Sequence, residues 1–260
     1  MIPSDRLGSV IYKRGHLVTG INQHPNRPNK VQINYINKIT AYKDSDEFDY
    51  VVCTLPFSAL REVEIKPRFS NQKMQAIFEF NYIDAQKTAF LCNQRFWESN
   101  TPYGNINGGS SVTDLPIQFI VYPSDHIHSM EEQSILAMEP GVLTASYNLS
   151  QEAVRLANLT EWRRLQVIRQ NVEEVHGLPR GYLNSLVDDF KTVHWNKEPN
   201  FRGGFAFALP GQKNIFAYSM LQPEYQNRVF FAGEHISTKH GWIQGALYTG
   251  KDVANQLLNS

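Results

Sequence analysis

An acidic residue near the C-terminus lies between an apolar run and a glycine-rich turn. Glu234 follows the run 229–232 and Gly233, and the turn 241–245 leads into a helical pattern that reaches Leu258. This order predicts a strand that delivers a carboxylate beside the N-terminus of a helix. Such a place suits a polyol and a developing negative charge, because the free N–H groups of a helix N-terminus stabilise anions.

These residues resemble the C-terminal signature of the flavin-containing amine and L-amino acid oxidases. The match covers Phe230-Phe231-Ala232-Gly233-Glu234 and then Gly-Trp-Ile-x-Gly-Ala from Gly241. In that family the acid binds the ribityl chain of FAD, and the next helix points its N-terminus at the pyrimidine edge of the flavin, where reduced flavin gathers negative charge. The resemblance implies FAD as cofactor, and the residues that it implicates are Gly233, Glu234, Gly241, Trp242, Ile243 and Ala246, with Gly241 and Trp242 also near the substrate.

Lys87 is the second candidate. It opens the apolar run 87–92, which precedes Phe96 and Trp97. A lysine at the start of a strand usually lies on the surface. The segment is also similar to the family segment in which a lysine holds a water near the reactive nitrogen of the flavin and assists reoxidation by oxygen. The resemblance therefore implies a catalytic role for Lys87, and a buried ammonium would suit that role because it can stabilise superoxide-like charge in a dry site.

Three further positions carry weaker parts of the resemblance. Val18 lies in an apolar strand pattern similar to the family strand whose valine contacts the adenine end of FAD through its backbone. Tyr122 ends a strand pattern similar to the one that helps to bind the substrate carboxylate. Trp195 precedes the Gly-aromatic segment 203–205, as a tryptophan beside the flavin does in the family. For each of the three, packing in a core is the alternative interpretation.

Other patterns predict no further chemistry. His126 and His128 would share one face of a strand, but no third ligand accompanies them, so we expect no metal site. Asp188 and Asp189 are typical of a solvated turn. The sequence has no Gly-x-Ser-x-Gly, P-loop or His-Glu-x-x-His pattern.

Composition narrows the class of protein. The 260 residues are 42% hydrophobic and 19% charged, and 25 basic residues balance 25 acidic ones. We therefore expect a folded globular protein, with neither nucleic acid nor an acidic membrane surface as a main partner. No window has the apolar length of a membrane span, and residues 1–10 lack the apolar core of a signal peptide, so the default expectation is a cytoplasmic location. Cys53, within an apolar run, is expected in the core.

The apolar periodicity predicts the elements that must position these residues. The clearest helix is 161–176, where Leu165, Ile168, Val172 and Val175 form an apolar stripe that Gly177 ends. The run 49–55 is typical of a strand buried on both faces. We expect strands at 10–12, 17–21, 30–35, 49–55, 87–92, 115–122, 141–148 and 229–232, helices at 56–60, 161–176 and 243–258, a turn at 24–29, and loops at 101–114 and 195–211.

The order of these elements predicts a fold that is both α/β and α+β. We expect a partial FAD-binding, Rossmann-like sheet to which both ends of the chain contribute, with a mixed-sheet substrate domain inserted between them. The expected ranges are 1–64 and 217–260 for the two FAD-domain segments and 65–216 for the substrate-binding domain.

The resemblance matches only the C-terminal portion of a family member. The Gly-x-Gly-x-x-Gly turn, which holds the pyrophosphate of the cofactor, does not occur in these residues. Three interpretations stay open: a partial gene product, one subunit of a split oxidase whose second chain supplies the FAD-binding half, or a degenerate remnant. A module that binds a partner chain and no flavin is the competing class.

For the complete enzyme, the resemblance implies oxidation of an L-amino acid or amine to an imine. The imine would then yield a keto acid or aldehyde plus ammonia, with oxygen reduced to hydrogen peroxide. An amino acid is preferred as substrate because Gly241-Trp242-Ile243 is closest to the L-amino acid oxidase form.

Overall fold

The structure is a computed structural model that describes residues 8–124 and 137–259. The chain forms two compact units: unit 1 combines Met1–Phe80 with Ala208–Ser260, and unit 2 is Asn81–Phe207. The pair His126 and His128, considered above as metal ligands, lies outside the described residues.

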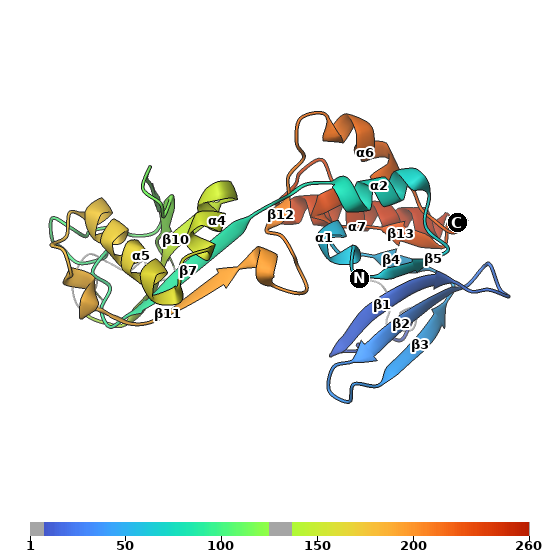
Figure 1. Cartoon of the computed structure of the whole chain (residues 1–260), viewed down its shortest axis with the longest axis horizontal. Coiled ribbons are helices and arrows are strands. Elements are labelled where there is room, and N and C mark those ends of the chain that lie inside the picture. The colour runs from blue at the N-terminus through green and yellow to red at the C-terminus, as the bar shows by residue number, and fades with distance from the viewer. Residues whose placement is uncertain (1–7, 125–136, 260) are drawn as a thin grey trace. The chain divides into compact units, whose positions relative to one another are not determined.

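Unit 1 contains a four-stranded sheet with the order β3-β2-β1-β5 (Figure 1). Neighbours pair antiparallel except for β5, which runs parallel to β1. The strands expected at 17–21 and 30–35 and the turn between them are confirmed. The strands are β1 His16–Gln23, β2 Val31–Asn37, β3 Lys43–Phe48 and β5 Glu64–Lys66.

The strand expected at 10–12 is wrong. These residues form no strand, and Val10, Ile11 and Tyr12 are largely exposed. β-Propensity alone does not make a strand, because a strand also needs a neighbour with which it pairs, and residues 10–12 pair with none of the described strands.

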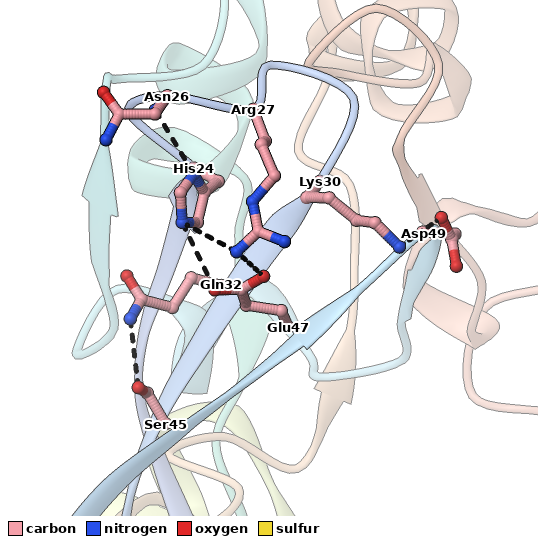
Figure 2. Close-up of polar contacts among 8 residues, drawn as sticks. All are labelled: His24, Asn26, Arg27, Lys30, Gln32, Ser45, Glu47 and Asp49. Carbon is pink, nitrogen blue, oxygen red and sulfur yellow. Dashed lines mark hydrogen bonds and ion pairs between the residues drawn. The ribbon is translucent and has the colours of Figure 1, made fainter.

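Polar contacts attach β3, whose sequence has no apolar alternation, to the hairpin before it (Figure 2). The guanidinium of Arg27 and the ring of His24 both approach the Glu47 carboxylate, at 2.5 and 3.2 Å. The Lys30 ammonium lies 2.6 Å from Asp49. Exposed ion pairs add little stability each, so these contacts supplement the backbone pairing of β3 with β2.

A parallel pair of short strands forms a second sheet in unit 1. All of β13 is buried, but Val52 in β4 is 40% exposed, so the expectation that the run 49–55 is buried on both faces is wrong. The predicted helices at 56–60 and 243–258 are confirmed as α1 and α7. The elements are β4 Val51–Cys53, α1 Phe57–Leu60, α2 Asn71–Glu79, α6 Gln212–Leu221, β13 Val229–Phe231, the 3₁₀ turn η4 Glu234–Ile236 and α7 Ile243–Leu258.

Unit 2 is built on a five-stranded antiparallel sheet with the order β11-β7-β10-β9-β8. Figure 1 labels β7, β10 and β11 of this sheet. Strands β6 and β12 form a separate two-stranded antiparallel sheet. The strands are β6 Tyr82–Ile83, β7 Ala85–Cys92, β8 Ser110–Val112, β9 Phe119–Val121, β10 Gly141–Leu149, β11 Val187–His194 and β12 Phe205–Ala206, and the helical segments are α4 Ser150–Ala157, α5 Glu161–His176, η2 Tyr182–Asn184 and η3 Trp195–Lys197.

Several expectations for unit 2 are corrected. Asp188 and Asp189 belong to β11 rather than to a turn, because an edge strand can leave polar side chains in solvent. The strand expected at 115–122 shortens to Phe119–Val121, because Gln118 has a positive φ of 56° that an extended strand does not allow. The expected loop 101–114 includes the short strand β8.

Helix α5 has the predicted bounds and the predicted buried stripe. Thr160 caps its N-terminus by accepting the N–H of Arg163, and Gly177 ends it with a φ of 66°. Ile168 and Val172 are fully buried in the core of unit 2. Helix α5 therefore covers the sheet with the side chains that the sequence indicates.

The observed class is α/β with mixed, parallel and antiparallel sheets. The compact units divide at different residues from the expected ranges, because α2 packs on α1 and α6 and so keeps residues 65–80 in unit 1.

Candidate cofactor-binding turn

Glu234 lies where β13 passes into η4, and its carboxylate reaches forward to the glycine turn. Its Oε2 atom accepts the N–H of Gly241 at 2.7 Å, two residues before α7 begins. Its backbone oxygen lies 3.0 Å from the Nδ1 atom of His240. The predicted placement of a carboxylate beside the start of a helix is therefore present within unit 1.

Thr249 fixes the end of β13 on α7. Its hydroxyl accepts the N–H of Gly233 at 2.9 Å and lies 3.1 Å from the carbonyl oxygen of the same glycine. Gly233 has a φ of 145°, and a Cβ there would lie 2.5 Å from the ring of His235. The position thus needs glycine for the close packing of the turn itself.

His235 forms the buried side of this turn. Its ring packs edge-on against Phe57, with 4.8 Å between ring centroids. Burial, followed by the nearby charges of Lys73 and His240, lowers the pKa of His235 to about 3. The imidazole is therefore neutral near pH 7 and behaves as a core ring.

The outer side of the turn is open within unit 1. Trp242 is 67% exposed and Ile243 is 77% exposed, whereas Ala246 is half-buried. Among residues 8–124 and 137–259, no side chain caps the N-terminus of α7. The Gly245 N–H donates to the Trp242 carbonyl, and the N–H groups before it suit an external acceptor. A carboxylate beside uncapped helix N–H groups suits the sugar chain and the electron-rich ring edge of a flavin, so these residues fit the cofactor implied by the sequence.

Lys87 lies on the exposed face of β7. Gln86 and Thr88, its neighbours in the strand, are fully buried, so strand alternation places Lys87 on the opposite side. It pairs across the sheet with Tyr147, and its Nζ atom lies 4.4 Å from the centroid of that ring. The buried ammonium anticipated for Lys87 is thus not present in unit 2.

The three weaker candidates lie in both units, Tyr122 and Trp195 in unit 2 and Val18 in unit 1. Tyr122 is 3% exposed, and its hydroxyl lies 2.9 Å from both Ser111 Oγ and His176 Nε2. Burial raises the pKa of Tyr122. Trp195 begins η3, half-buried and edge-on to Phe201 at 5.3 Å.

Val18 lies in β1 of unit 1, half-buried. The structure therefore gathers Glu234 and the glycine turn at one place in unit 1, while Lys87, Tyr122 and Trp195 belong to unit 2. Thr249 was missed. The sequence signal that could have found it is a threonine within the apolar helical pattern 243–258, and the structure shows that Thr249 is buried.

Comparison with known proteins shows the family to which this chain belongs. The profile described as flavin containing amine oxidoreductase matches residues 7–258. The chain belongs to this family. FAD is the cofactor of the family, so the flavin expected from the sequence is confirmed at that level.

Relatives and solved structures agree with the assignment. YobN of Bacillus subtilis, named as a candidate L-amino-acid oxidase, is 36% identical over 88% of this chain and 45% of its own length. The L-amino-acid oxidase of Echis ocellatus is 26% identical over 96% of this chain and 45% of its own. A redesigned putrescine oxidase has a TM-score of 0.74 at 13% identity, covering 94% of this chain and 48% of that one, which shows the shared fold. The chain thus spans less than half the length of these proteins.

Two further observations concern metal binding and membrane-spanning helices. Among the described residues, no group of three or more His, Cys, Asp or Glu side chains could hold a metal ion. None of the helices within 8–124 and 137–259 has both the length and the apolarity to cross a membrane.

Proposed function

We propose that this chain supplies the C-terminal part of an FAD-dependent oxidase that converts an L-amino acid, or an amine, to an imine. The imine is then hydrolysed to a keto acid or aldehyde and ammonia, and oxygen is reduced to hydrogen peroxide. The contact between the Glu234 carboxylate and the Gly241 N–H at the uncapped end of α7 carries this proposal. The preference for an amino acid is supported by relatives that are named L-amino-acid oxidases.

The chain's own residues would bind and orient. The Glu234 carboxylate, which accepts the Gly241 N–H through Oε2, would also accept a hydroxyl of the ribityl chain. The first N–H groups of α7 would stabilise negative charge on the flavin ring. The bound flavin supplies the acceptor for the electron pair of the substrate. The backbone of Val18 would contact the adenine end.

In unit 2, Lys87 would hold a water and a positive charge where oxygen reacts, and Tyr147 keeps its ammonium over an aromatic face. The roles proposed for Tyr122 and Trp195 are contacts with the substrate. The Tyr122 hydroxyl already has two partners, so a substrate carboxylate would have to compete with Ser111 and His176 for it.

We also propose that β4 and β13 belong to a larger, Rossmann-like sheet, in which the two terminal segments of the chain form part of an FAD domain and the segment between them a substrate domain. The parallel pairing of these two strands supports this. The other half, in the same polypeptide or in a second chain, would cover the exposed Trp242, Ile243 and Val52.

A second candidate function is a module that binds a partner chain and holds no flavin. The exposed apolar side chains at the start of α7 and the missing pyrophosphate-binding pattern favour it. The absorption spectrum separates the two candidates. The chain would be purified, mixed with FAD and separated from free cofactor. Bands near roughly 370 and 450 nm in the protein fraction would support cofactor binding.

A matched pair of variants assigns the binding to Glu234. Glu234→Gln should weaken FAD binding by about tenfold or more, since it replaces a charged acceptor by a neutral one. Glu64→Gln, on the exposed strand β5, should leave it unchanged. Bleaching of the bands by L-amino acids would support the substrate class. A colourless protein at saturating FAD would favour the partner-binding module.

A further inference from the structure

A hollow of about 310 Å³ lies on unit 2 along one face of α5. Its first wall consists of helix residues three or four positions apart, and its second wall is the turn that follows the helix, which includes η2. Figure 1 shows α5 as a helix covering the strands of this unit. The residues that decide its chemistry are Trp162, Arg169, Gln170, Glu173, Arg180 and Asn184. Its volume is that of a site for a small molecule.

Glu173 joins the two walls. Its carboxylate oxygens accept the N–H groups of Gly181 and Leu183, at 2.9 and 3.0 Å. The side chain is 3% exposed, so these bonds use most of its accessible acceptor capacity. These bonds therefore hold the two walls at a fixed spacing. Glu173 would act on a ligand mainly through its negative charge, because its oxygens already accept backbone N–H groups.

Two arginines supply charged donors to the hollow, and its amide side chains can donate or accept. The Arg169 guanidinium is anchored by its Nη2 atom, which donates to the Val187 carbonyl at 3.3 Å. Its Nε atom is buried and has no hydrogen-bond partner in the part of the chain that the structure describes. Arg180 stands exposed on the other wall. Two arginines against one engaged carboxylate leave the hollow positively charged, and guanidinium forks match carboxylates in shape.

The rim adds an aromatic surface. The side chain of Trp162 is 67% exposed, and that of Leu165, one turn further along α5, is half-buried. An indole face beside an aliphatic side chain suits a planar ring, which can stack while its charged end reaches the arginines. We propose that this hollow binds a small aromatic carboxylate. None of the residues to which FAD or substrate contacts were assigned lines it, so the site is separate from the proposed oxidase site.

The test follows backbone and indole N–H signals of the whole chain by NMR during titration with phenylacetate. The Trp162 indole and the Gly181 amide should shift together and saturate. Phenylacetamide has no charge and acetate has no ring. Each should bind at least about tenfold more weakly than phenylacetate. Arg180→Gln should weaken phenylacetate binding about tenfold, whereas Arg155→Gln, on the exposed face of α4, should not change it.

Arg169→Lys provides a second variant, because it keeps the charge and removes the planar fork. It should bind phenylacetate several-fold more weakly and retain the spectrum of the folded chain. The assignment is overturned if saturating phenylacetate leaves Trp162 and Gly181 unshifted, or if phenylacetamide binds as tightly as phenylacetate. Equal binding of inorganic phosphate would likewise overturn the aromatic carboxylate as the ligand class. Since no flavin takes part, a failure here is distinct from a failure of the oxidase proposal.

Discussion

Replacing Glu173 by glutamine changes one buried acceptor and leaves the volume of the side chain nearly unchanged. In the wild-type chain both carboxylate oxygens accept backbone N–H groups, from Gly181 and Leu183. An amide can keep one of these bonds, but its NH₂ group then faces the other N–H donor. Leu183 is fully buried, so its N–H cannot turn to water. The loss of a charged hydrogen bond and the cost of an unpaired buried donor together give about 2–4 kcal/mol.

The neighbouring residue offers a matched control. Glu174 is exposed and lies on the same turn of α5, so Glu174→Gln should change the free energy of unfolding by less than about 0.5 kcal/mol. Urea unfolding of the wild type and both variants, followed through hydrogen exchange of α5 amides, measures the difference. If Glu173→Gln and Glu174→Gln were equally stable, the two N–H contacts would not hold the turn on the helix, and the rigid second wall of the hollow would have no basis.

Three other predictions concern the glycines, the buried histidine and the threonine under the cofactor-binding turn. Gly177→Ala should destabilise unit 2 by about 1 kcal/mol because the φ of Gly177 is 66°. Gly250 lies inside α7 with nothing within 4 Å of an added Cβ, so Gly250→Ala should stabilise unit 1 by about 0.5–1 kcal/mol. Thermal unfolding measures the sign of each change. The pKa of His235 is about 3 in the fold against 6.5 in the unfolded chain, so the unfolded state binds more protons as the pH falls below about 6.5. Unit 1 should lose about 2 kcal/mol between pH 7.5 and 5, measured by exchange of β13 amides, and a pH-independent result would contradict the burial of this ring. Thr249→Val should cost about 1–3 kcal/mol by leaving the Gly233 N–H unpaired, and Tyr248→Phe, exposed on the same helix, should have little effect; chemical denaturation compares them.

Helix α5 could be predicted from the sequence because every local signal agreed. In α5 the apolar stripe, the Thr160 cap and the terminal Gly177 all indicate the same bounds. Helix α6 was missed because its apolar residues do not form one stripe: Phe216 is buried, while Ile215 and Tyr218 are exposed. Without a preferred face, its sequence offers no period to recognise.

Strand β3 was missed for a related reason. Its sequence, Lys-Asp-Ser-Asp-Glu-Phe, has no apolar alternation, and its place in the sheet depends on partners distant in sequence. The contacts of Arg27 with Glu47 and of Lys30 with Asp49 join it to the preceding hairpin. Such ion pairs are not visible until the register of the strands is known.

The carboxylate of the candidate site was predictable, but the surroundings of the lysine were not. Glu234 lies between two features that the local sequence predicts, a buried strand and a glycine turn, and the structure contains both. Which face of β7 carries Lys87 depends on the alternation of the whole sheet and on the helices that cover one side. Tyr122 ends on the covered side for the same reason, with His176 of α5 against its hydroxyl.

Contacts within unit 1 organise the cofactor-binding turn. The Glu234 carboxylate accepts the N–H of Gly241, and the Thr249 hydroxyl accepts the N–H of Gly233. Because the turn does not depend on a flavin for these bonds, a colourless chain would not mean that the turn is unformed. It would mean that this half alone does not hold the cofactor, as expected for the partner-binding module, because the contacts to the pyrophosphate are not made. The affinity of the chain for FAD therefore measures what the other half must contribute, and the loss of that affinity in Glu234→Gln measures what this turn contributes.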